Sequence, residues 1–430
     1  MNQKIKKLVD GQGRKITKLF EEQKLNQKIK KSKKQEIKTK TRKQENKKIK
    51  KRKKPTPPLP RLQIRKDIVT LQGVRRGAGK KTKDRPNRIT RAKSSLVLKK
   101  LEENPIISPN PQNDWESQQT FNPGVVLLDN KVYFLYRAIG EDGISRMGYA
   151  VSSDGITIDA RLPYPVYEHK INDKKFGIFS YLSGGSWGGA EDPRIVRVGD
   201  EDLLYMTYTA CDNGLRVGLT SITVDDFLKR KWRWGMPALI SPPNEIHKNW
   251  VVFPEKINGQ YAILHSIVPH IEIAYRNDLN FGVEDLIYSP RVFGVQKSNF
   301  DKSRWERWLR GTGAPPLKTK DGWLLFYHAM DNDWSKYKVG VLLLDLKDPT
   351  KILYRAKEPI LEPEEFYENN GYKGGVVYLS GAIIKEGNLL VYYGCADNYV
   401  GVAYGNLNKF LATLKKEAKP KLKLKRLKKK

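Results

Sequence analysis

Apolar stretches that are interrupted by a turn and end in aromatic residues recur five times along the chain. They read VVLLDNKVYFLYRA (125–138), IVRVGDEDLLYMTYTA (195–210), FPEKINGQYAILHSI (253–267), PLKTKDGWLLFYHAM (316–330) and AIIKEGNLLVYYGCA (382–396). The interruptions contain Gly, Asn or Asp, which tight turns between antiparallel strands favour. Each of the five stretches therefore predicts a β-hairpin.

A further apolar strand follows each hairpin. These strands are SRMGYAVSS, LRVGLTSIT, IEIAYRNDL, YKVGVLLLD and NYVGVAYGN. The aromatic-ending strands of successive copies begin 71, 58, 62 and 66 residues apart, and no helical pattern intervenes. This period suits a four-stranded unit with a variable loop and is too long for a solenoid repeat. The sequence predicts an all-β fold, a five-bladed β-propeller with short, protected strand edges; an ordinary β-sandwich is the alternative.

Charge divides the chain of 430 residues, whose formal net charge is +34, into three parts. Residues 1–100 hold 37 Lys and Arg against 7 Asp and Glu, and residues 415–430 hold 10 against 1, which leaves −5 for residues 101–414. We expect two basic tails, disordered or partly helical, around the propeller domain, with a stiff Pro-rich spacer at 55–60. Blocks of like charge are often interaction tails, so we expect non-specific binding to a polyanion such as nucleic acid or an anionic surface. A purely solubilising role is the alternative.

Cysteine usage and hydropathy narrow the class of protein. Cys211 and Cys395 lie at the ends of apolar runs and cannot make a disulfide framework. No run approaches the ~18 apolar residues of a membrane span, and the first residues lack the apolar core of a signal peptide. We expect a cytoplasmic protein with no transmembrane segment. No cluster of His, Asp and Glu has the spacing of a metal site, so no metal is expected.

Segments rich in Gly and Pro precede the hairpins, where a propeller places the mouth of its channel. They are FNP (121–123), GGAEDPR (188–194), KNWVVFPE (248–255), RGTGAPP (310–316) and YKGGVVYLSGA (372–382). On an extended chain, Glu191 and Asp192 point to opposite sides and Arg194 lies on the side of Asp192. Asp192 and Arg194 are therefore a candidate acid and anion clamp; a structural bridge that pins a turn is the alternative.

The ordered set FNP, YRA, SRMGYA, GGAEDPR, FPEKINGQY, GTGAPPLKTKDGWLLFYH and YYGCAD resembles glycoside hydrolase family 130. The resemblance covers about residues 104–410 and leaves both tails unexplained. It implies a five-bladed propeller that cleaves β-mannosides with inversion. It also implies that Asp192 is the proton donor, which in the family's phosphorylases acts through a sugar hydroxyl. Phosphate then attacks the anomeric carbon from the opposite face and yields mannose 1-phosphate.

A phosphorylase needs cations for phosphate, and Arg and Lys are the usual ones. The expected phosphate ligands are Arg146, Arg194, Lys248 and His265, with Arg310 as a further basic candidate. The residues expected to bind the β-mannoside substrate are Asn122, Arg137 and Asp397. Inorganic phosphate is expected as co-substrate, and no other cofactor is implied.

Two departures from the family pattern keep other functions open. Ser266 follows the third-repeat His where the phosphorylases often have Arg, and the segment GYKGGVVYLSGA differs from the usual run. A missing cation favours hydrolysis, which needs a second carboxylate about 6.5–9.5 Å away to activate water. Candidates for that carboxylate are Glu255, Asp142, Asp331 and Asp333. We expect a β-mannoside phosphorylase; an inverting β-mannosidase and a non-catalytic carbohydrate-binding propeller are the alternatives.

Overall fold

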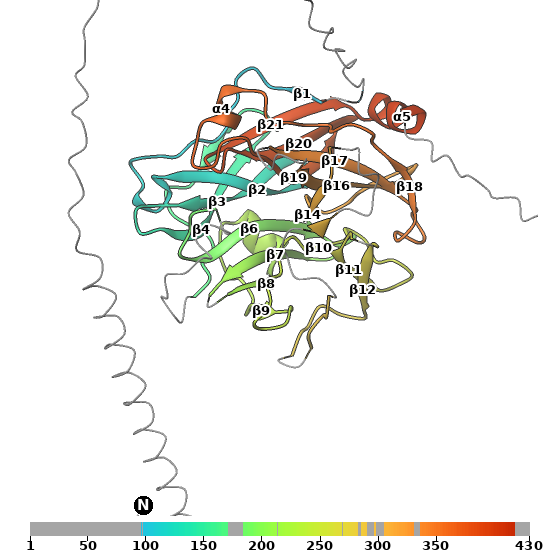
Figure 1. The fold of residues 1–430 in the computed structure, drawn as a ribbon. Helices are drawn as coiled ribbons and strands as arrows, with labels where there is room; N and C mark the ends of the chain where they lie inside the picture. The colour runs from blue at the N-terminus through green and yellow to red at the C-terminus, as the bar shows by residue number, and fades with distance from the viewer. Residues whose placement is uncertain are drawn as a thin grey trace, which may run out of the picture. The chain divides into compact units, whose positions relative to one another are not determined.

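A computed structural model describes residues 96, 98–170, 184–212, 214–268, 270–282, 285–289, 296–297, 305–330 and 336–417. Nearly all of the predicted basic tails, the spacer at 55–60, Asp331 and Asp333 therefore lie outside the described residues. The described residues belong to the compact unit Ile89–Lys430. They form mainly β-strands, so the prediction of a mostly β protein is confirmed (Figure 1).

The described strands fall into five consecutive antiparallel groups, and each group contains one predicted hairpin and the strand that follows it. The first group is β2 (Gln119–Leu128), β3 (Lys131–Ile139), β4 (Ile144–Ser152) and β5 (Ala160–Arg161). The second is β6 (Gly188–Arg197), β7 (Leu203–Cys211), β8 (Leu215–Thr223) and β9 (Ala238–Leu239). The third is β10 (Val251–Val252), β11 (Tyr261–Ser266) and β12 (Glu272–Arg276). A short parallel bridge between β4 and β6 joins the first two groups.

The fourth group is β13 (Gln296–Lys297), β14 (Trp308–Thr312), β15 (Leu317–Thr319), β16 (Gly322–Met330), β17 (Tyr337–Leu344) and β18 (Ile352–Arg355). The fifth is β19 (Val377–Lys385), β20 (Asn388–Cys395) and β21 (Tyr399–Asn406), to which β1 (Lys99–Lys100) adds at the edge of β21. The described helices are short: η1 (Asp114–Glu116), α3 (Val224–Leu228), α4 (Phe366–Asn369) and α5 (Leu407–Glu417). No helix among the described residues has the length and apolar character needed to cross a membrane.

The predicted turn chemistry is present in the hairpins. Asp129–Asn130, Asn258–Gly259 and Glu386–Gly387 are two-residue turns in which both residues have positive φ. Such turns match the twist of antiparallel strands, and Asn, Asp and Gly adopt them at the least cost. Local sequence therefore determines where these hairpins reverse.

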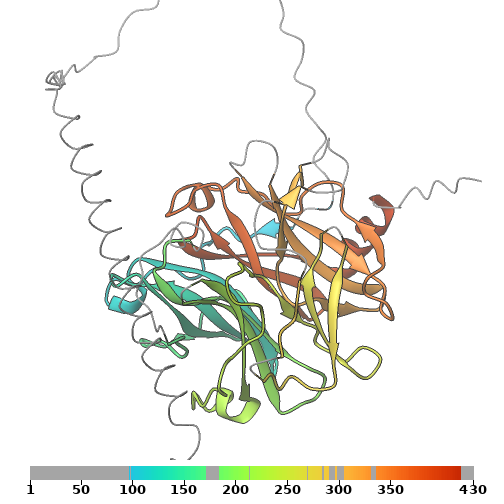
Figure 2. The same ribbon diagram turned by 60° about the horizontal axis from the view of Figure 1, so that its bottom comes forward.

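Large hydrophobic clusters lie between successive groups and also between the fifth group and the first. Tyr133 and Leu135 of β3 pack toward the second group, whereas Phe134 and Tyr136 of the same strand pack toward the fifth. Further clusters join the second group to the third, the third to the fourth, and the fourth to the fifth. Strands that are buried on both faces have nearly continuous apolar sequences. The early strands in cyan lie beside the late strands in red (Figure 2).

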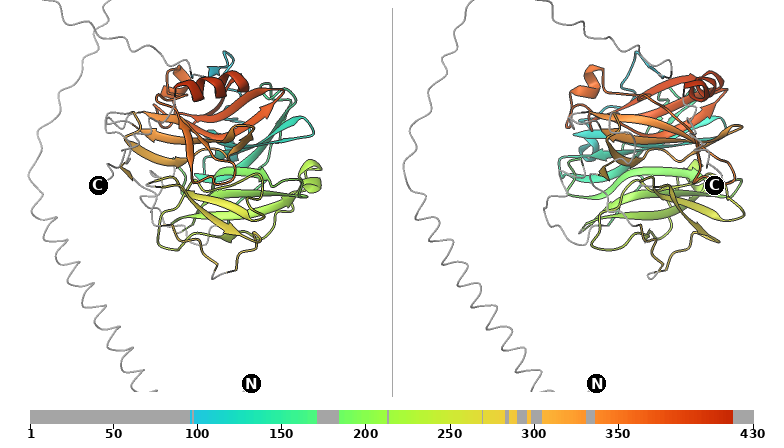
Figure 3. Two further views of the ribbon diagram at one scale, coloured as in Figure 1. Left: turned by 90° about the vertical axis from the view of Figure 1, so that its right-hand side faces the viewer. Right: turned by 45° about the vertical axis from the view of Figure 1, so that its right-hand side comes forward.

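Residues before the predicted 101–414 domain take part in this core, and helix α5 continues past the C-terminal bound of that domain. Leu96 and Leu98 are each 2% exposed and pack in the cluster between the fourth and fifth groups. Phe410, Leu411 and Leu414 of α5 pack in the same cluster. The red helix α5 lies against the late strands (Figure 3). The fold therefore begins before residue 101 and includes α5 up to residue 417.

A tyrosine that lies across a glycine recurs in four of the described groups. The directly opposed pairs are Tyr136–Gly148, Tyr208–Gly218, Tyr327–Gly340 and Tyr393–Gly401. A Cβ on Gly340 would lie 2.3 Å from Cζ of Tyr327, and one on Gly148 would lie 2.2 Å from Cζ of Tyr136. Only glycine leaves room for the ring at these positions.

The hydroxyl of the tyrosine meets a buried carboxylate in three of these groups. Tyr136 donates to Glu116 at 2.7 Å, Tyr327 donates to Glu306, and Tyr393 donates to Glu368 at 3.0 Å. A cation from another strand of the same group balances each carboxylate, and these cations are Arg161, Arg355 and Lys100 respectively. A buried charge requires such a partner, so each set holds several strands of one group together.

Candidate active site

The first long strand of four groups is interrupted at equivalent points, and these points line the centre of the domain. The pairing register skips at Asn122 in β2, Asp192 in β6, Arg310 in β14 and Ser380 in β19. In the third group Asn249, two residues before β10, has φ 65°, and Asn122 and Asp192 have φ 45° and 49°. A bulge of this kind re-aims side chains away from the normal alternation of a strand.

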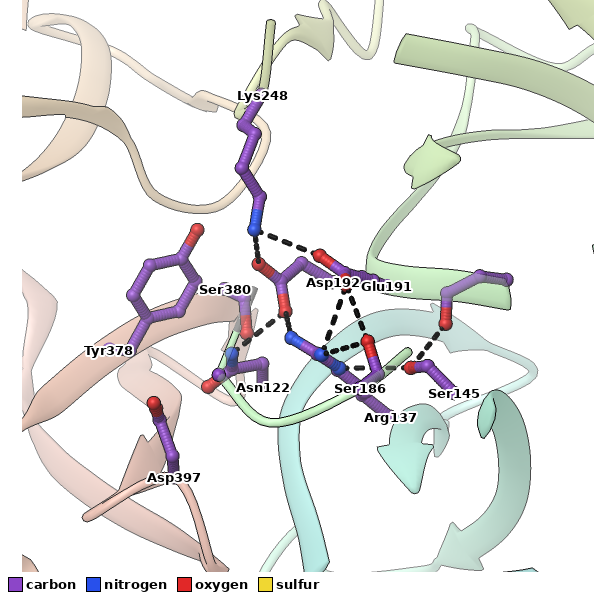
Figure 4. Close-up of polar contacts among 12 residues, drawn as sticks. Asn122, Arg137, Ser145, Ser186, Glu191, Asp192, Lys248, Tyr378, Ser380 and Asp397 are labelled. Atoms are coloured by element: carbon purple, nitrogen blue, oxygen red, sulfur yellow. Dashed lines mark hydrogen bonds and ion pairs between the residues drawn. The ribbon is translucent and has the colours of Figure 1, made fainter. Parts of the chain in front are cut away.

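The bulge at Asp192 overturns the expectation that Glu191 and Asp192 point to opposite sides. Both carboxylates contact the same two cations, Arg137 and Lys248 (Figure 4). The expectation assumed an extended backbone, whereas Asp192 is in the left-handed region. The two neighbouring carboxylates therefore belong to one cluster of charges.

A pocket opens where the five groups meet, and its space measures about 440 Å³, including part that is open to solvent. Its lining residues are Asn122, Arg137, Gly184, Asp192, Lys248, Arg310, Tyr337, Lys373, Val376, Tyr378 and Asp397. Every group contributes at least one of them. Four cations and two carboxylates make the pocket a polar site with an excess of positive charge.

Asp192 lies between two cations and an amide. Its Oδ1 accepts from Nδ2 of Asn122 at 2.8 Å and lies 3.2 Å from Nη1 of Arg137. Its Oδ2 lies 3.7 Å from Nζ of Lys248. Glu191 lies closer than Asp192 to Lys248, at 2.9 Å, and at the same distance of 3.2 Å from Arg137. Two positive and two negative groups thus form one buried cluster (Figure 4).

The two carboxylates of the pocket have opposite pKa shifts. Burial raises the pKa of Asp192, but the charges of Lys248, Arg137 and Arg194 outweigh it. The hydrogen bond from Asn122 acts in the same direction, so the pKa of Asp192 lies well below its usual range.

Asp397, in the turn between β20 and β21, has a raised pKa. Burial is the main cause, and the charge of Asp192 adds to it, while Lys373 and Arg137 lower the pKa of Asp397 by less. Without a ligand, Asp192 is therefore ionised, and Asp397 is the carboxyl that holds a proton more readily.

Comparison with known proteins identifies the family. A family model for glycoside hydrolase family 130, described as beta-1,4-mannooligosaccharide phosphorylase, matches residues 97–416. The chain belongs to glycoside hydrolase family 130. The match covers all five strand groups and, among the described residues, every residue of the pocket.

Relatives within family 130 act on mannosides. A 1,2-beta-oligomannan phosphorylase of Thermoanaerobacter sp. (strain X514) is 37% identical over 72% of this chain and 97% of its own. A beta-1,2-mannobiose phosphorylase of the same organism is 36% identical over 71% of this chain and 96% of its own. A solved structure, described with family-130 glycoside hydrolases that target beta-1,2 mannosidic linkages in Candida mannan, has a TM-score of 0.58 and is 26% identical over 73% of this chain and 94% of that one.

Five of the eight residues expected to form the family-130 site line the pocket. They are Asn122, Arg137, Asp192, Lys248 and Asp397. Arg310, the further basic candidate, also lines it. Residues from distant parts of the sequence are thus brought together at one place.

Arg194 lies behind the pocket, and its contacts are to backbone and neutral groups. It donates to the carbonyl oxygens of Asp192 at 2.6 Å and Gly313 at 2.9 Å. It also donates to Asn249 Oδ1 at 3.0 Å and to the Tyr378 hydroxyl at 2.9 Å. These hydrogen bonds use three of its nitrogens, so Arg194 holds the bulge in place and does not bridge the Asp192 carboxylate.

Arg146 and His265 also lie outside the pocket lining. Arg146 pairs with Asp142 at 2.6 Å and with Glu168 at 3.0 Å. His265 packs on Trp250, with ring centroids 5.5 Å apart, and burial together with the charge of His247 lowers the pKa of His265 to about 4. The phosphate roles of Arg146 and His265 stay predictions, and the geometry gives them no direct access to the pocket.

The candidate bases for hydrolysis lie elsewhere. Glu255 pairs with Lys318 at the surface, and Asp142 pairs with Arg146. Neither lines the pocket. Within the part of the chain that the structure describes, no group of three or more His, Cys, Asp or Glu could hold a metal ion.

Sequence reasoning did not assign a role to several residues of the site. Glu191 was adjacent to the candidate acid, and Lys373 and Tyr378 lie in the segment before the fifth hairpin, which was singled out only as a segment. The neighbourhood of these three residues in the sequence therefore pointed to the site, although their roles were not assigned. Tyr337 begins the strand after the fourth hairpin, and nothing in its sequence context marks it as part of a site.

Proposed function

We propose that this protein is an inverting phosphorylase of β-1,2-linked mannosides, which yields mannose 1-phosphate. The observation that carries the proposal is a buried acid, Asp192, in a pocket lined by Arg137, Lys248, Arg310 and Lys373. A phosphorylase needs one acid and a cationic place for phosphate, whereas an inverting hydrolase needs a second carboxylate as base. The membership in family 130 supports the same activity.

Each charged residue of the pocket has a role in this reaction. Asp192 donates the proton to the leaving oxygen, through a hydroxyl of the mannose. A phosphate oxygen attacks the anomeric carbon from the opposite face, the glycosidic C–O bond breaks, and its electrons go to the protonated leaving oxygen. Asn122 and Asp397 hydrogen-bond the mannose. Lys248 and Arg137, which face the acid, hold the phosphate together with Arg310 and Lys373. This gives Arg137 a role at phosphate in place of the mannoside contact expected from the sequence.

The β-1,2 linkage rests on the relatives. Those that are 37% and 36% identical are named for 1,2-linked mannosides, over nearly the full length of each relative. The description of the family model names a β-1,4 activity, so linkage is a property to be measured for this chain.

We also propose that the five strand groups are the blades of a five-bladed β-propeller. The support is the cyclic order of the hydrophobic clusters, of which one joins the fifth group to the first. A pocket to which every group contributes is what the centre of a propeller provides.

The deciding experiment is a product assay. The full chain is incubated with β-1,2-mannobiose, β-1,2-mannotriose or β-1,4-mannobiose, with and without inorganic phosphate. The proposal expects mannose 1-phosphate from the β-1,2 substrates only when phosphate is present. Turnover that is unchanged when phosphate is withheld contradicts it, and faster turnover of β-1,4-mannobiose contradicts the linkage alone.

Hydrolysis is the second candidate, because Asp397 is a second buried carboxylate in the same pocket. A solved relative is also described with glycoside hydrolases of the family. This function predicts free mannose without phosphate, and it predicts that Asp397→Asn removes that release.

The basic tails are proposed to contact a polyanion without specificity. The support is their charge, since residues 1–100 hold 37 Lys and Arg against 7 Asp and Glu. Exposed charges of one sign attract polyanions in a salt-dependent way.

A further inference from the structure

A proton donor must carry its proton when the sugar is bound, and the surroundings of Asp192 oppose this in the free protein. Its two oxygens lie 3.2 Å from Arg137 and 3.7 Å from Lys248. Both cations are themselves buried and line the pocket. Asn122 donates a further hydrogen bond to the carboxylate at 2.8 Å. All three contacts stabilise the ionised form, which is the wrong form for acid catalysis.

We propose that the anionic co-substrate itself loads the proton onto Asp192, by taking over the positive charge of Lys248 and Arg137. This inference rests on the proposed function, since it assigns phosphate to the pocket. When the anion binds, the two cations interact with it as well as with Asp192, and its negative charge faces the carboxylate. Asp192 then takes one proton from solvent, and the O–H bond that forms is the one later broken in the transfer to the leaving oxygen.

The geometry of Lys248 favours this exchange. Its Nζ is 2.9 Å from Glu191 but 3.7 Å from Asp192, so Glu191 is the closer partner. Glu191 is fully buried and does not line the pocket, whereas Asp192 and Lys248 both do. An anion arriving from the pocket therefore meets Lys248 on the side of Asp192, and Glu191 remains as its permanent counter-charge.

Charge balance points in the same direction. Arg137, Lys248, Glu191 and Asp192 are two cations and two anions, so these four residues are neutral together before the anion arrives. A dianion that binds against Lys248 and Arg137 adds two negative charges close to Asp192, which Arg310 and Lys373 of the pocket lining partly offset. Protonation of Asp192 is the change that removes one of these charges without moving any side chain, and like charges a few ångströms apart disfavour joint ionisation.

Other charged and titratable groups surround the acid on every side. They are Arg194 on β6, His328 on β16, Tyr378 on β19, Asp397 after β20, and Arg310 and Lys373 in the pocket lining. Burial and the charge of Arg194 lower the pKa of His328 to about 3, so this ring stays neutral near pH 7. The raised pKa of Asp397 makes it the competing site for the same proton.

The consequence is that acid catalysis is switched on by phosphate. Without the anion, Asp192 stays ionised between its cations and cannot assist departure of the leaving group. Attack by water is then suppressed because the acid is missing. The coupling explains how a site with a strongly ionised carboxylate can use that carboxylate as a donor.

The test measures protons taken up when an anion binds, in the absence of sugar. Sulfate is the probe, because it stays a dianion across the range from about pH 5.5 to about pH 8 and so brings no proton of its own. Calorimetric titrations of the full chain in two buffers of different ionisation enthalpy give the number of protons exchanged. Wild type is expected to take up close to one proton per sulfate, and its sulfate affinity is expected to rise by up to about tenfold per pH unit on acidification.

Two variants identify the group that takes the proton. Asp192→Asn is expected to bind sulfate with no proton uptake, and Asp397→Asn is expected to keep the uptake. Lys229→Gln removes a surface lysine that pairs with Asp225 and serves as a matched control for loss of one positive charge. It is expected to behave as wild type.

The outcomes separate this inference from the proposed function. Sulfate binding without proton uptake in wild type overturns the inference, even if mannose 1-phosphate is formed. Uptake that persists in Asp192→Asn but disappears in Asp397→Asn also overturns it and makes Asp397 the loaded acid. Absence of any sulfate or phosphate binding, together with no mannose 1-phosphate, removes the proposed function itself.

Discussion

Replacing Glu191 by Gln tests how the buried cluster sets the strength of the acid. The change keeps the shape of the side chain and removes one negative charge beside Asp192. Oε2 of Glu191 and Oδ2 of Asp192 lie 2.9 Å and 3.7 Å from the same Nζ, so they are no farther apart than about 6.6 Å. Two unit charges at about 6.6 Å repel by about 2.5 kcal/mol at an effective dielectric constant of about 20, or nearly 2 pKa units.

Loss of that repulsion lowers the pKa of Asp192 further, because the ionised form no longer faces a second negative charge. The protonated donor becomes about 60-fold rarer at a given pH. We therefore expect kcat/KM for the mannoside to fall roughly fiftyfold in Glu191→Gln. Lys248 and Arg137 lose one counter-charge, so the KM for phosphate is expected to fall, which means tighter binding.

The assay is the initial rate of mannose 1-phosphate formation, with β-1,2-mannobiose varied at fixed phosphate and phosphate varied at fixed β-1,2-mannobiose. Breaking a buried charge cluster costs about 3–5 kcal/mol of stability, so the folded fraction of Glu191→Gln is checked first by thermal unfolding. Ser186→Ala is the matched control, because it removes the 2.7 Å hydrogen bond to Glu191 but no charge. A folded Glu191→Gln enzyme with unchanged kcat/KM for the mannoside and weaker phosphate binding would refute the reasoning.

Three further predictions follow from the fold. Gly340→Ala places a Cβ 2.3 Å from Cζ of Tyr327, so we expect the free energy of unfolding in urea to fall by about 1–3 kcal/mol or more. Gly235→Ala is the control, because a Cβ there has its nearest contact at 3.3 Å, and it should cost clearly less. Burial lowers the pKa of His328 to about 3 in the folded protein. The stability that the neutral ring contributes is therefore complete above the pKa of His in the unfolded chain and is lost as pH falls. His328→Gln should reduce the difference in unfolding free energy between pH 7 and pH 5 by about 2 kcal/mol, and an unchanged difference contradicts this. A chain cut to residues 96–417 should keep full turnover and lose salt-sensitive retention on heparin; equal retention would show that the tails are not the binding element.

Much of the strand arrangement could be predicted from the sequence because hairpins depend on local chemistry. The turns at Asp129–Asn130 and Glu386–Gly387 carry residues suited to positive φ. The apolar strands beside them are long enough to be buried on both faces. Tyr136 and Gly148 lie in the segments YRA and SRMGYA of the recurring pattern, but that they oppose each other emerged only from the structure.

The candidate site was only partly predictable, because its chemistry depends on contacts between distant groups. Asp192 and Lys248 are 56 positions apart in the sequence, and only the fold brings them to 3.7 Å. Arg194 carries the charge expected of an anion clamp, yet its donors go to carbonyl oxygens and neutral groups around the bulge. A sequence gives the type of a side chain but not which acceptors lie within its reach.

The sequence by itself determined the five recurring hairpins, the mostly β character, the separation of charge between tails and body, and Asp192 as the acid to examine. The tertiary structure decided where each of these groups points. A left-handed residue at Asp192 turns its carboxylate and that of Glu191 toward the same two cations, which an extended strand does not allow. Alternation along a strand is a local rule, whereas the bulge depends on the whole fold, because Arg194 beside it donates to Gly313, Asn249 and Tyr378 of other strand groups.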